Sequence, residues 1–510
     1  MSLIIEKLLS HCEHRPNSIA IDDSVQRLTF KELYEWVENF SQYLTDLCVK
    51  TIGFQLDNGL SWVVFDLAAM KAGINIVPIP SFFSQQQREH IIQTARIDVL
   101  ILDTDIKLND AWQKIENPGI AQMKDLKNPF TTYSREVLDP IEYSNTKITF
   151  TSGSTGSPKG VCLANATVES VAVSIDKALF SLELNSHLSV LPLATLLENI
   201  AGVYAPLIRG MCVHVPSLSL VGLVGSNLDV EKFSKMINQV NPNSIILVPQ
   251  LLTALVTLKQ FDLITVDNFQ MIAVGGGRVS QHLLESAQDM GLPVCQGYGL
   301  SECCSVLTLN TSGKTKPNSV GKILPHANVR INSEGEIEAN GSNMLGYLGD
   351  DVSFGEWYPT GDLGSIDDEG FVYITGRKKN VFITSFGRNV NPEWVESALT
   401  QQAAISQAFI FGESKSHNLA LIWLRFPQSE SEIEQMVNSA NAELPDYARA
   451  SAFIVVDENL SNDLVTPNGR LKRDLVLARF QDLIDGHYSV HGKEARNKEE
   501  QKESSALTFS

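Results

Sequence analysis

The spacing of apolar positions along the first three quarters of the chain alternates between two periods. Apolar residues three and four apart predict amphipathic helices, and short apolar runs between them predict buried strands. Strands that alternate with helices form parallel sheets covered on both faces, and ligands collect beyond the carboxyl ends of such strands. The pattern therefore predicts an α/β fold whose parallel-rich sheets are sandwiched by helices. The predicted helices are Leu33–Leu44, Trp62–Met70 and Val168–Leu179, and the predicted strands are Ile74–Val77, Ser244–Val248 and Met271–Val274.

After Lys379 the pattern changes to short elements of mixed kind, typical of an α+β module of about a hundred residues. From His487 onward the chain is polar and charged, and it holds too little apolar surface to offset the entropy of ordering, so we expect disorder there. The predicted elements of the module are helices Pro392–Leu399 and Glu432–Glu443 and strands Ala408–Phe411, Leu419–Leu424 and Phe453–Val456.

Composition and charge exclude some classes of function. The chain has 510 residues, of which 43% are hydrophobic and 19% charged, as in a soluble globular protein of several subdomains. Its formal net charge of −19 argues against a nucleic-acid partner, because neutralising phosphates needs a basic face. Apolar runs such as Leu188–Leu197 are too short to span a bilayer, and the first residues lack the apolar core of a signal peptide. We expect a cytoplasmic protein without a transmembrane segment, with peripheral membrane contact and oligomeric state left open.

The cysteines give no support for a zinc site. None of the seven forms a Cys-x-x-Cys pair, and the odd number fits reduced thiols. Cys303 and Cys304 directly follow Glu302, so they either line a substrate cleft or are buried like most free cysteines.

Residues 151–160 carry the most specific chemistry of the chain. They read Thr-Ser-Gly-Ser-Thr-Gly-Ser-Pro-Lys-Gly after the β-branched run Ile148–Phe150, which predicts a strand leading into the loop. Glycines let a backbone approach a polyphosphate, hydroxyl groups donate hydrogen bonds, and Lys159 adds a positive charge. The loop does not have the Walker spacing. It is a candidate phosphate loop, and the alternative is a surface turn rich in serine and glycine.

This loop resembles the phosphate loop of the adenylate-forming superfamily, and the resemblance continues in order over most of the chain. It is carried by Gly275–Gly277 after an apolar strand, by Tyr298-Gly299-Leu300-Ser301-Glu302, by Tyr358-Pro359-Thr360-Gly361-Asp362 and by Gly376-Arg377-Lys378-Lys379-Asn380. The sequence as a whole looks most like bacterial fatty acyl-CoA synthetases.

The resemblance implies a domain division and two half-reactions. It implies an adenylation domain over 1–376, a hinge over 377–380 with Lys379 at the turning position, a small mobile lid domain over 381–485 and the polar tail 486–510. ATP and a carboxylic acid would form an acyl-adenylate and pyrophosphate, with Mg²⁺ as the required cation. A thiol, either CoA or the phosphopantetheine of an acyl carrier protein, would then displace AMP.

The resemblance also implies roles for single residues. Glu302 would hold Mg²⁺, Asp362 would accept the ribose hydroxyls, Arg377 would donate to ribose or phosphate, and Gly387 and Arg388 would line the thiol tunnel. For Glu302, Asp362 and Arg377 the alternative is a surface ion pair. Catalytic groups would be Thr155, Glu302 and a cation near residue 470. The nucleotide set is Thr151, Ser152, Gly153, Ser154, Thr155, Gly156, Lys159, Gly275, Gly276, Gly277, Tyr298, Gly299, Ser301, Asp362 and Arg377.

One departure from the family pattern concerns the bridging cation of adenylation. The family has a lysine in an Asn-Gly-Lys segment, and here the segment is Asn468-Gly469-Arg470, with Lys472 two residues on. Arginine keeps the charge and changes the geometry. We favour Lys472 slightly over Arg470 as the bridging group.

The substrate is less clearly marked. The segment Leu191–Asn199 has no aspartate for an amino group, and Thr195 stands where many acyl-CoA synthetases have histidine. Runs Ile200–Ile208 and Leu218–Val224 form either a hydrocarbon slot or ordinary core, and Glu198 is able to accept an amine or hydroxyl of a less usual acid. We expect a ligase of medium- or long-chain fatty acids with CoA. The alternatives are an acyl-AMP ligase that loads a carrier protein and an impaired acyl-AMP-binding or regulatory protein.

Overall fold

The computed structural model divides the chain into two compact units, Met1–Lys378 and Lys379–Ser510, which are described separately. The division falls inside the segment 377–380 that was predicted as a hinge. The structure describes all residues except 1, 104–107, 109, 116–129, 138, 152–157, 226, 278, 280, 312, 314, 351–354, 387, 443, 459, 462, 467–470 and 507–510, and only the backbone of 282, 389 and 490–506.

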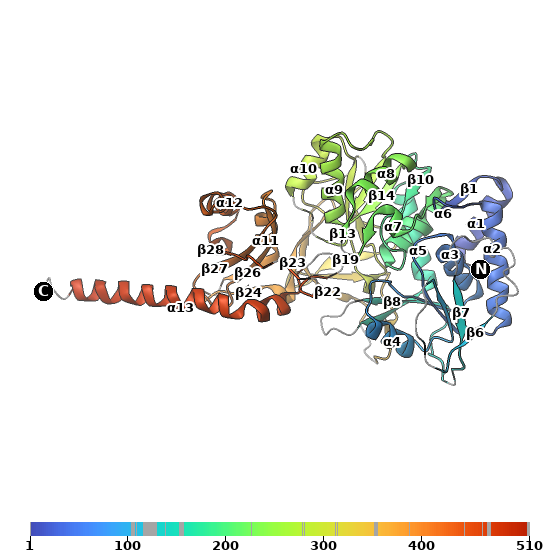
Figure 1. The fold of residues 1–510 in the computed structure, drawn as a ribbon, viewed down its shortest axis with the longest axis horizontal. Helices are drawn as coiled ribbons and strands as arrows, with labels where there is room; N and C mark the ends of the chain where they lie inside the picture. The colour runs from blue at the N-terminus through green and yellow to red at the C-terminus, as the bar shows by residue number, and fades with distance from the viewer. Residues whose placement is uncertain are drawn as a thin grey trace. The chain divides into compact units, whose positions relative to one another are not determined.

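The first unit contains a nine-stranded sheet whose central part is parallel (Figure 1). Its strands pair in parallel from β1 through β11, β10, β14 and β15 to β16, and antiparallel partners close both edges. In spatial order the strands are β18 (Lys322–Ile323), β17 (Thr308–Leu309), β16 (Val294–Tyr298), β15 (Met271–Val274), β14 (Ser244–Leu247), β10 (Ser186–Leu188), β11 (Cys212–His214), β1 (Ile19–Asp22) and β2 (Arg27–Thr29).

A second sheet of eight strands has a parallel centre, β5-β3-β4-β8, and antiparallel edges. In spatial order its strands are β21 (Gly346–Tyr347), β9 (Lys159–Ala164), β8 (Thr146–Thr151), β4 (Asn75–Pro78), β3 (Thr51–Gln55), β5 (Val99–Leu102), β7 (Thr131–Ser134) and β6 (Gln113–Ile115).

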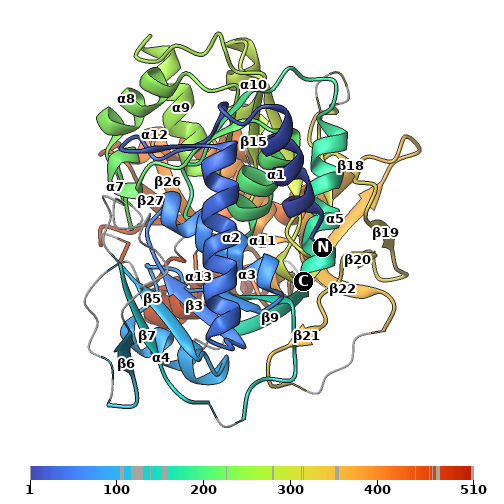
Figure 2. The same cartoon turned by 90° about the vertical axis from the view of Figure 1, so that its right-hand side faces the viewer.

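Helices fill the space between the two sheets. Successive strand residues face opposite sides, so Ile52 and Phe54 of β3 join the large central core, whereas Leu100 of β5 packs on the other face with α4 (Gln85–Thr94). The central core also takes Ile21 of the nine-stranded sheet, which places it between the sheets. Figure 2 shows α2 at the front of this layer with α1 and α3 beside it. The helices of this core are α1 (Leu3–His14), α2 (Phe30–Asp46), α3 (Leu60–Ala72), α5 (Asn165–Ala178), the π-helix η2 (Glu198–Tyr204) and α6 (Ala205–Arg209).

Further helices cover the outer face of the nine-stranded sheet and gather beside β14 in Figure 1. They are α8 (Val230–Val240), α9 (Pro249–Gln260) and α10 (Gln281–Asp289), with the short helix α7 (Leu218–Val221) and the hairpin β12 (Leu223–Val224) and β13 (Asn227–Leu228) before them. The predicted fold class is confirmed, because both large sheets have parallel centres and helical layers.

A four-stranded antiparallel sheet completes the first unit, and the apolar pattern did not predict it. Its strands are short or irregular, with register shifts in β22, so they lack a clean alternation. In spatial order they are β19 (Asn328–Ile331), β20 (Glu336–Asn340), β22 (Tyr358–Ile366) and β23 (Val372–Arg377).

The second unit is the predicted α+β module. Its three-stranded sheet buries one face against α11 and α12 and the other against α13. All five elements predicted for the module are present. The elements are η4 (Lys378–Asn380), β24 (Phe382–Ile383), β25 (Asn389–Val390), α11 (Pro392–Thr400), β26 (Ile405–Phe411), β27 (Asn418–Leu424), α12 (Glu430–Ala442), η5 (Asp446–Ala448), β28 (Ala450–Val455) and α13 (Arg473–Ala506).

The end of the chain differs from the expected disordered tail 486–510, because α13 continues as a helix to Ala506. The stretch beyond residue 490 is rich in Glu and Lys, which have high intrinsic helix propensity, and it extends a helix already anchored by Val476, Phe480 and Ile484. None of the described helices combines the length and the apolar content needed to cross a bilayer.

Candidate active site

The predicted phosphate loop connects two hydrogen-bonded strands of the eight-stranded sheet. β8 ends at Thr151 and β9 begins at Lys159, opposite each other in the antiparallel register. Residues 152–157, which include the predicted Ser152, Gly153, Ser154, Thr155 and Gly156, lie outside the described residues. The described flanks show that β8 and β9 pair antiparallel up to Thr151 and Lys159, and the strand predicted before the loop is present.

Lys159 lies beside Tyr347 from the neighbouring strand β21. Its Nζ is 5.1 Å from the centre of the Tyr347 ring and 3.9 Å from an Asp350 carboxylate oxygen. Tyr347 pairs with Val161 of β9, and its hydroxyl donates a hydrogen bond to Glu302 Oε1 at 3.0 Å. One tyrosine therefore links the end of the phosphate loop to the glutamate predicted to hold magnesium.

Glu302 lies in a short 3₁₀ turn, η3 (Ser301–Cys303), that follows β16. Its backbone carbonyl accepts the Met344 N–H at 2.7 Å, which ties the turn to the segment before β21. Burial is the main cause that raises the pKa of Tyr347 to about 12, so this residue stays a neutral donor to Glu302. A carboxylate that accepts one hydrogen bond still offers oxygen lone pairs to a hard cation.

Glu302 alone does not form a metal cage. Among the described residues no group of three or more His, Cys, Asp and Glu is arranged to hold a metal ion. This fits Mg²⁺, which is commonly held by one or two carboxylates together with substrate phosphates and water.

The turn between β16 and η3 depends on Gly299. A Cβ at this position would lie 1.7 Å from the Ser305 carbonyl oxygen, so only glycine fits. Cys304 and Ser305 adopt positive φ angles of 58° and 82°, and the chain doubles back against Gly299. This packing fixes the direction in which Glu302 points.

Asp362 lies at the centre of a second cluster. Its carboxylate accepts a hydrogen bond from the Tyr298 hydroxyl at 2.7 Å and pairs with Arg377 Nε at 2.7 Å. Asp362 and Arg377 are direct partners in the β22–β23 register, and Arg377 also donates to the Thr360 carbonyl at 3.2 Å. Burial, followed by the charge of Asp362, raises the pKa of Tyr298 well above its usual value.

The glycines of residues 275–277 follow β15 at its carboxyl end. The Gly275 N–H donates to the Leu247 carbonyl at 3.1 Å, and a Cβ on Gly275 would lie 3.6 Å from both Gly297 O and Leu197 Cδ2. The segment therefore lies directly beside β16 and beside Leu197, at the sheet edge where α/β folds bind ligands.

Thr195 lies on the segment between β10 and η2. Its hydroxyl donates to the Pro192 carbonyl at 2.6 Å, and it is half-buried. Asn58 holds both sides of this proline, because it donates to the Leu191 carbonyl at 2.9 Å and accepts the Leu193 N–H at 2.8 Å.

The structure shows the surroundings of residues for which the sequence left both a cleft position and a core position open. Cys303 and Cys304 are buried free thiols, and Ile200–Ile208 belong mainly to the central core. Glu198 is fully buried and lies 3.3 Å from His187 Nε2, and burial raises its pKa.

The second unit holds the remaining predicted residues. Lys472 is at the base of a loop closed by the Val465–Leu471 bridge, and its Nζ donates to the Asp463 carbonyl at 2.9 Å. Arg388 is exposed on the β24–β25 hairpin, and Lys379 lies in η4. Arg470 and Gly387 fall outside the described residues.

Sequence reasoning missed Tyr347, Tyr358 and Asn58. Tyr347 and Tyr358 hydroxyls lie 3.4 Å apart beside Glu302, although neither residue was assigned a role of its own. A weak signal exists for Tyr347, an aromatic residue that follows Gly346 in a turn-rich segment.

Comparison with known proteins identifies the family. The model of the AMP-binding enzyme family matches residues 8–348, and the model of the AMP-binding enzyme C-terminal domain matches residues 379–491. The chain therefore belongs to the AMP-binding enzyme family, as the resemblance implied.

Individual relatives include CoA ligases with different acids. The 2-succinylbenzoate–CoA ligase of Bacillus subtilis (strain 168) is 26% identical over 94% of this chain and 98% of its own. The long-chain-fatty-acid–CoA ligase FadD15 of Mycobacterium bovis is 29% identical over 44% of this chain and 42% of its own.

Solved structures share the fold. An anthranilate CoA ligase in complex with anthranoyl-AMP has a TM-score of 0.77 at 18% identity, covering 93% of this chain and 96% of its own. The Bacillus subtilis o-succinylbenzoate CoA synthetase in complex with ATP and a magnesium ion has a TM-score of 0.72 at 23% identity, covering 92% and 98%. The predicted enzyme class, an AMP-forming acid–thiol ligase, is confirmed, and ATP, Mg²⁺ and CoA are the cofactors that fit this class.

Proposed function

We propose that this enzyme binds ATP between the loop 151–160, the Gly275–Gly277 segment and the Tyr298–Asp362–Arg377 cluster. The observation that carries the proposal is a set of contacts between motifs far apart in the sequence. Tyr347 links the Lys159 end of the loop to Glu302. The same segment as Glu302 also contains Tyr298, whose hydroxyl donates a hydrogen bond to Asp362. These contacts bring four segments, around residues 159, 298–302, 347 and 362, into one region of the first unit.

The chemistry follows from charge. A carboxylate that attacks the α-phosphate of ATP brings two anions together, and pyrophosphate leaves with further negative charge, so catalysis consists mainly of positioning and electrostatic stabilisation. Lys159 and Arg377 supply positive charge, and Asp362 suits the paired ribose hydroxyls because a carboxylate accepts several hydrogen bonds. Glu302 would hold Mg²⁺, which neutralises phosphate charge when bound.

The second half-reaction transfers the acyl group to a thiol, most simply that of CoA. We assign Lys379 as the hinge, with the division of the chain directly before it. Gly387 and Arg388 on the β24–β25 hairpin would border the thiol, and Arg388 would meet phosphate on the incoming carrier.

For the acid we propose a medium- or long-chain fatty acid, with Thr195 bordering the acyl group. The absence of an aspartate after Pro192 speaks against an amino acid, and Glu198 is engaged by His187. A second candidate is 2-succinylbenzoate. Relatives that align with nearly the whole chain are named 2-succinylbenzoate–CoA ligases. The cytoplasm is the compartment we propose for either activity.

A pyrophosphate-release screen with ATP and Mg²⁺ tests these assignments. The panel holds octanoate, palmitate, 2-succinylbenzoate and anthranilate, each with and without CoA. Turnover with the fatty acids and formation of their CoA thioesters supports the main proposal, and turnover confined to 2-succinylbenzoate supports the second candidate.

Two outcomes of the screen favour the remaining alternatives. If pyrophosphate is released and only a holo acyl carrier protein consumes the adenylate, the enzyme loads a carrier. If no acid is turned over while AMP binds tightly, the chain is an acyl-AMP-binding or regulatory protein, which would agree with the arginine at position 470.

A further inference from the structure

A buried lysine outside the predicted site joins the eight-stranded sheet to two helices that pack on it. Lys147 lies on β8, four residues before Thr151, and its side chain is only 1% exposed. Its Nζ donates to Asp66 Oδ1 at 2.6 Å, to Asn199 Oδ1 at 2.5 Å and to the Tyr204 hydroxyl at 2.7 Å. An ammonium group has three donors, so every one of them is used.

The partners also bond to one another. Asp66 of α3 accepts a hydrogen bond from Asn199 Nδ2 at 3.1 Å and another from the Tyr204 hydroxyl. The Lys147 ammonium further lies 4.9 Å from the centre of the Tyr204 ring. Lys147, Asp66, Asn199 and Tyr204, here called the Lys147 network, form a closed set with one lysine charge and one carboxylate.

A gain in stability is a weak explanation for a buried ion pair such as Lys147–Asp66. Removing a lysine and an aspartate from water costs several kcal/mol per ion, and well-packed apolar residues at buried ion pairs are often equally or more stabilising. Burial lowers the pKa of Lys147, and the charge of Asp66 opposes this shift. Buried polar networks whose members are all hydrogen-bonded make the surrounding core rigid.

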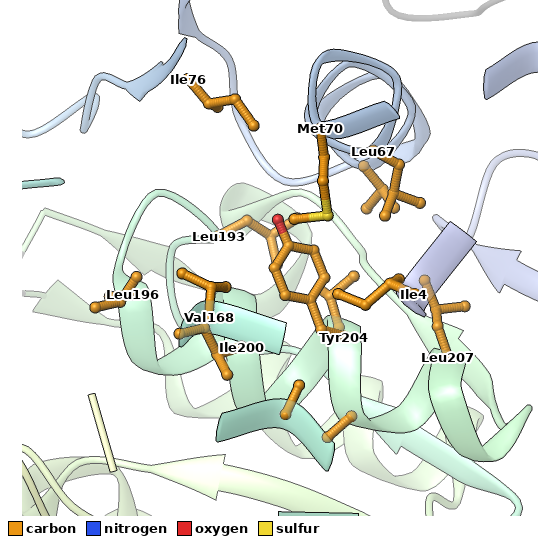
Figure 3. Close-up of a cluster of buried hydrophobic side chains, with 14 of the residues drawn as sticks. Ile4, Leu67, Met70, Ile76, Val168, Leu193, Leu196, Ile200, Tyr204 and Leu207 are labelled. Atoms are coloured by element: carbon orange, nitrogen blue, oxygen red, sulfur yellow. The ribbon is translucent and has the colours of Figure 1, made fainter. Parts of the chain in front are cut away.

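The network joins the strand that leads into the phosphate loop to the helix that follows the Thr195 segment. β8 leads through Thr151 into the phosphate loop, whereas Asn199 and Tyr204 belong to η2, which directly follows the segment 191–197 with Thr195. Figure 3 draws Tyr204 in a cluster with Leu67 and Met70 of α3 and with Leu193 and Leu196 of this segment.

The same segment is fixed at its other side to the nine-stranded sheet. Glu198, the first residue of η2, meets His187 of β10, and His187 Nδ1 lies 2.9 Å from the Ser244 hydroxyl. A Cβ at Gly202 would lie 2.3 Å from Glu198 Oε1 and 2.9 Å from His187 Nε2, so a larger residue there would displace one of these two side chains. π-Helical turns occur frequently at functional sites.

We propose that Lys147 is a positioning residue that couples the ATP phosphate loop to the acid-binding segment. It fixes β8 against η2, so that nucleotide bound at the end of β8 also restricts the motion of residues 189–204 before the acid binds. Reaction between two bound substrates depends on such alignment, because misplacement by about 1 Å is able to cost a hundredfold in rate. The proposal rests on the assignment of residues 151–160 to ATP phosphates.

Hydrogen exchange tests this coupling without knowledge of the acid. The full chain is compared with and without α,β-methylene-ATP and Mg²⁺, and exchange is followed in peptides that cover residues 189–204. In the native protein we expect the nucleotide to slow exchange there by at least about fivefold, the lower range of typical couplings between sites.

The test variant Lys147→Met with Asp66→Asn removes both charges together. We expect it to retain nucleotide binding and to lose the nucleotide-dependent protection of 189–204. Tyr204→Phe removes only the shared hydroxyl and serves if the double variant fails to fold, with a partial loss expected. The matched control is Lys71→Met with Glu38→Gln, which removes another α3 ion pair, at 2.8 Å, that involves neither β8 nor η2.

The outcomes separate the coupling from the proposed function. Full protection of 189–204 in a folded variant, or nucleotide binding without protection in the native protein, overturns the coupling and leaves the ATP site intact. Absence of nucleotide binding to the native protein contradicts the proposed function and the coupling with it. Once the screen identifies an acid, a rise in its KM in the Tyr204→Phe variant at saturating ATP provides a second check.

Discussion

At the scale of single residues, the proposed site contains carboxylates that are held by hydrogen-bond donors from neighbouring side chains. Asp362 is buried and is held by Tyr298 and Arg377, whereas Glu302 accepts from Tyr347. In both clusters a neutral tyrosine hydroxyl orients a carboxylate toward the region where nucleotide groups are expected.

The first prediction concerns Asp362. Asp362→Asn removes the charge that pairs with Arg377 and would accept the ribose hydroxyls. A hydrogen bond to a charged group contributes about 1.5–3 kcal/mol, and 1.4 kcal/mol is tenfold, so kcat/KM for ATP should fall by roughly 10- to 100-fold. Pyrophosphate release with varied ATP measures this.

The matched control is Asp367→Asn. Asp367 lies just beyond the end of β22 and pairs with Lys316 in an ion pair away from the Tyr298 cluster. We expect kcat/KM for ATP to stay within about twofold of the native value, because Asp367 pairs with Lys316 and is not part of the Tyr298 cluster. Equal effects of the two variants would contradict a ribose role for Asp362.

A second prediction concerns the bridging cation. Lys472→Ala should reduce acyl-adenylate formation more than thioester formation from supplied acyl-AMP, because the cation bridges carboxylate and α-phosphate only in the first step. Arg470→Ala is the comparison variant, measured in the same two assays. A larger loss of adenylation in Arg470→Ala would transfer the role to Arg470, and equal loss in both assays would refute the assignment to Lys472.

At the scale of elements, the site depends on turns that place side chains at the ends of strands. The β16–η3 turn brings Glu302 back toward β21, and the β8–β9 hairpin brings Lys159 to the same strand. These turns need close backbone packing, so substitution of their glycines is expected to disturb the site.

The third prediction concerns this packing. Gly299→Ala would place a Cβ 1.7 Å from the Ser305 oxygen, so the backbone must move. We expect a loss of more than about 3 kcal/mol in unfolding free energy, in the range of severe core substitutions, together with weaker nucleotide binding. Urea denaturation and titration with AMP measure the two effects.

Gly291→Ala is the control for Gly299→Ala. Gly291 has a φ of 73°, and a Cβ added there would have no other atom within 4 Å. Only the left-handed backbone is strained, at a cost of about 1–2 kcal/mol, with AMP binding unchanged. A smaller loss of unfolding free energy in Gly299→Ala than in Gly291→Ala would contradict the prediction, because the turn would then accommodate the Cβ.

At the scale of the whole molecule, burial of titratable groups makes the stability of the first unit depend on pH. Desolvation lowers the pKa of His326 to about 4, and it also lowers the pKa values of His11 and His214. All three histidines lie before residue 379, in the first unit.

The fourth prediction follows from the sign of these shifts. Between pH 6.5 and about 4 the unfolded chain takes up a proton at His326 that the folded chain does not, so stability falls as the pH falls through this window. His326 contributes at most about 1.4 kcal/mol per pH unit to the slope of the unfolding free energy against pH. Thermal unfolding from pH 7.5 to 4.5 should show a declining Tm, and His326→Leu should flatten the decline. An unchanged slope in that variant would exclude His326 as a source.

Much of the fold was predictable because it depends on local patterns. The helices α2 and α3 contain their predicted ranges and extend two or three residues beyond each end, and β15 matches its predicted range, since apolar patterning is a local signal. The four-stranded sheet was missed because β22 contains register shifts, and the helix beyond residue 486 was missed because low apolar content was taken to prevent order, although helix propensity acts without it.

By itself, the sequence determined the alternation of strands and helices and the order of the glycine-rich motifs, because side-chain periodicity and backbone freedom act over a few neighbouring residues. The roles of Glu302, Asp362 and Arg377 stay predictions that rest on the family resemblance. Only the tertiary structure decided that Tyr347 holds Glu302 from 45 residues away and that Lys147 meets Asp66 across 81 residues. Such pairs form when sheets stack and leave polar atoms in a shared interior, where each group needs a partner in place of water.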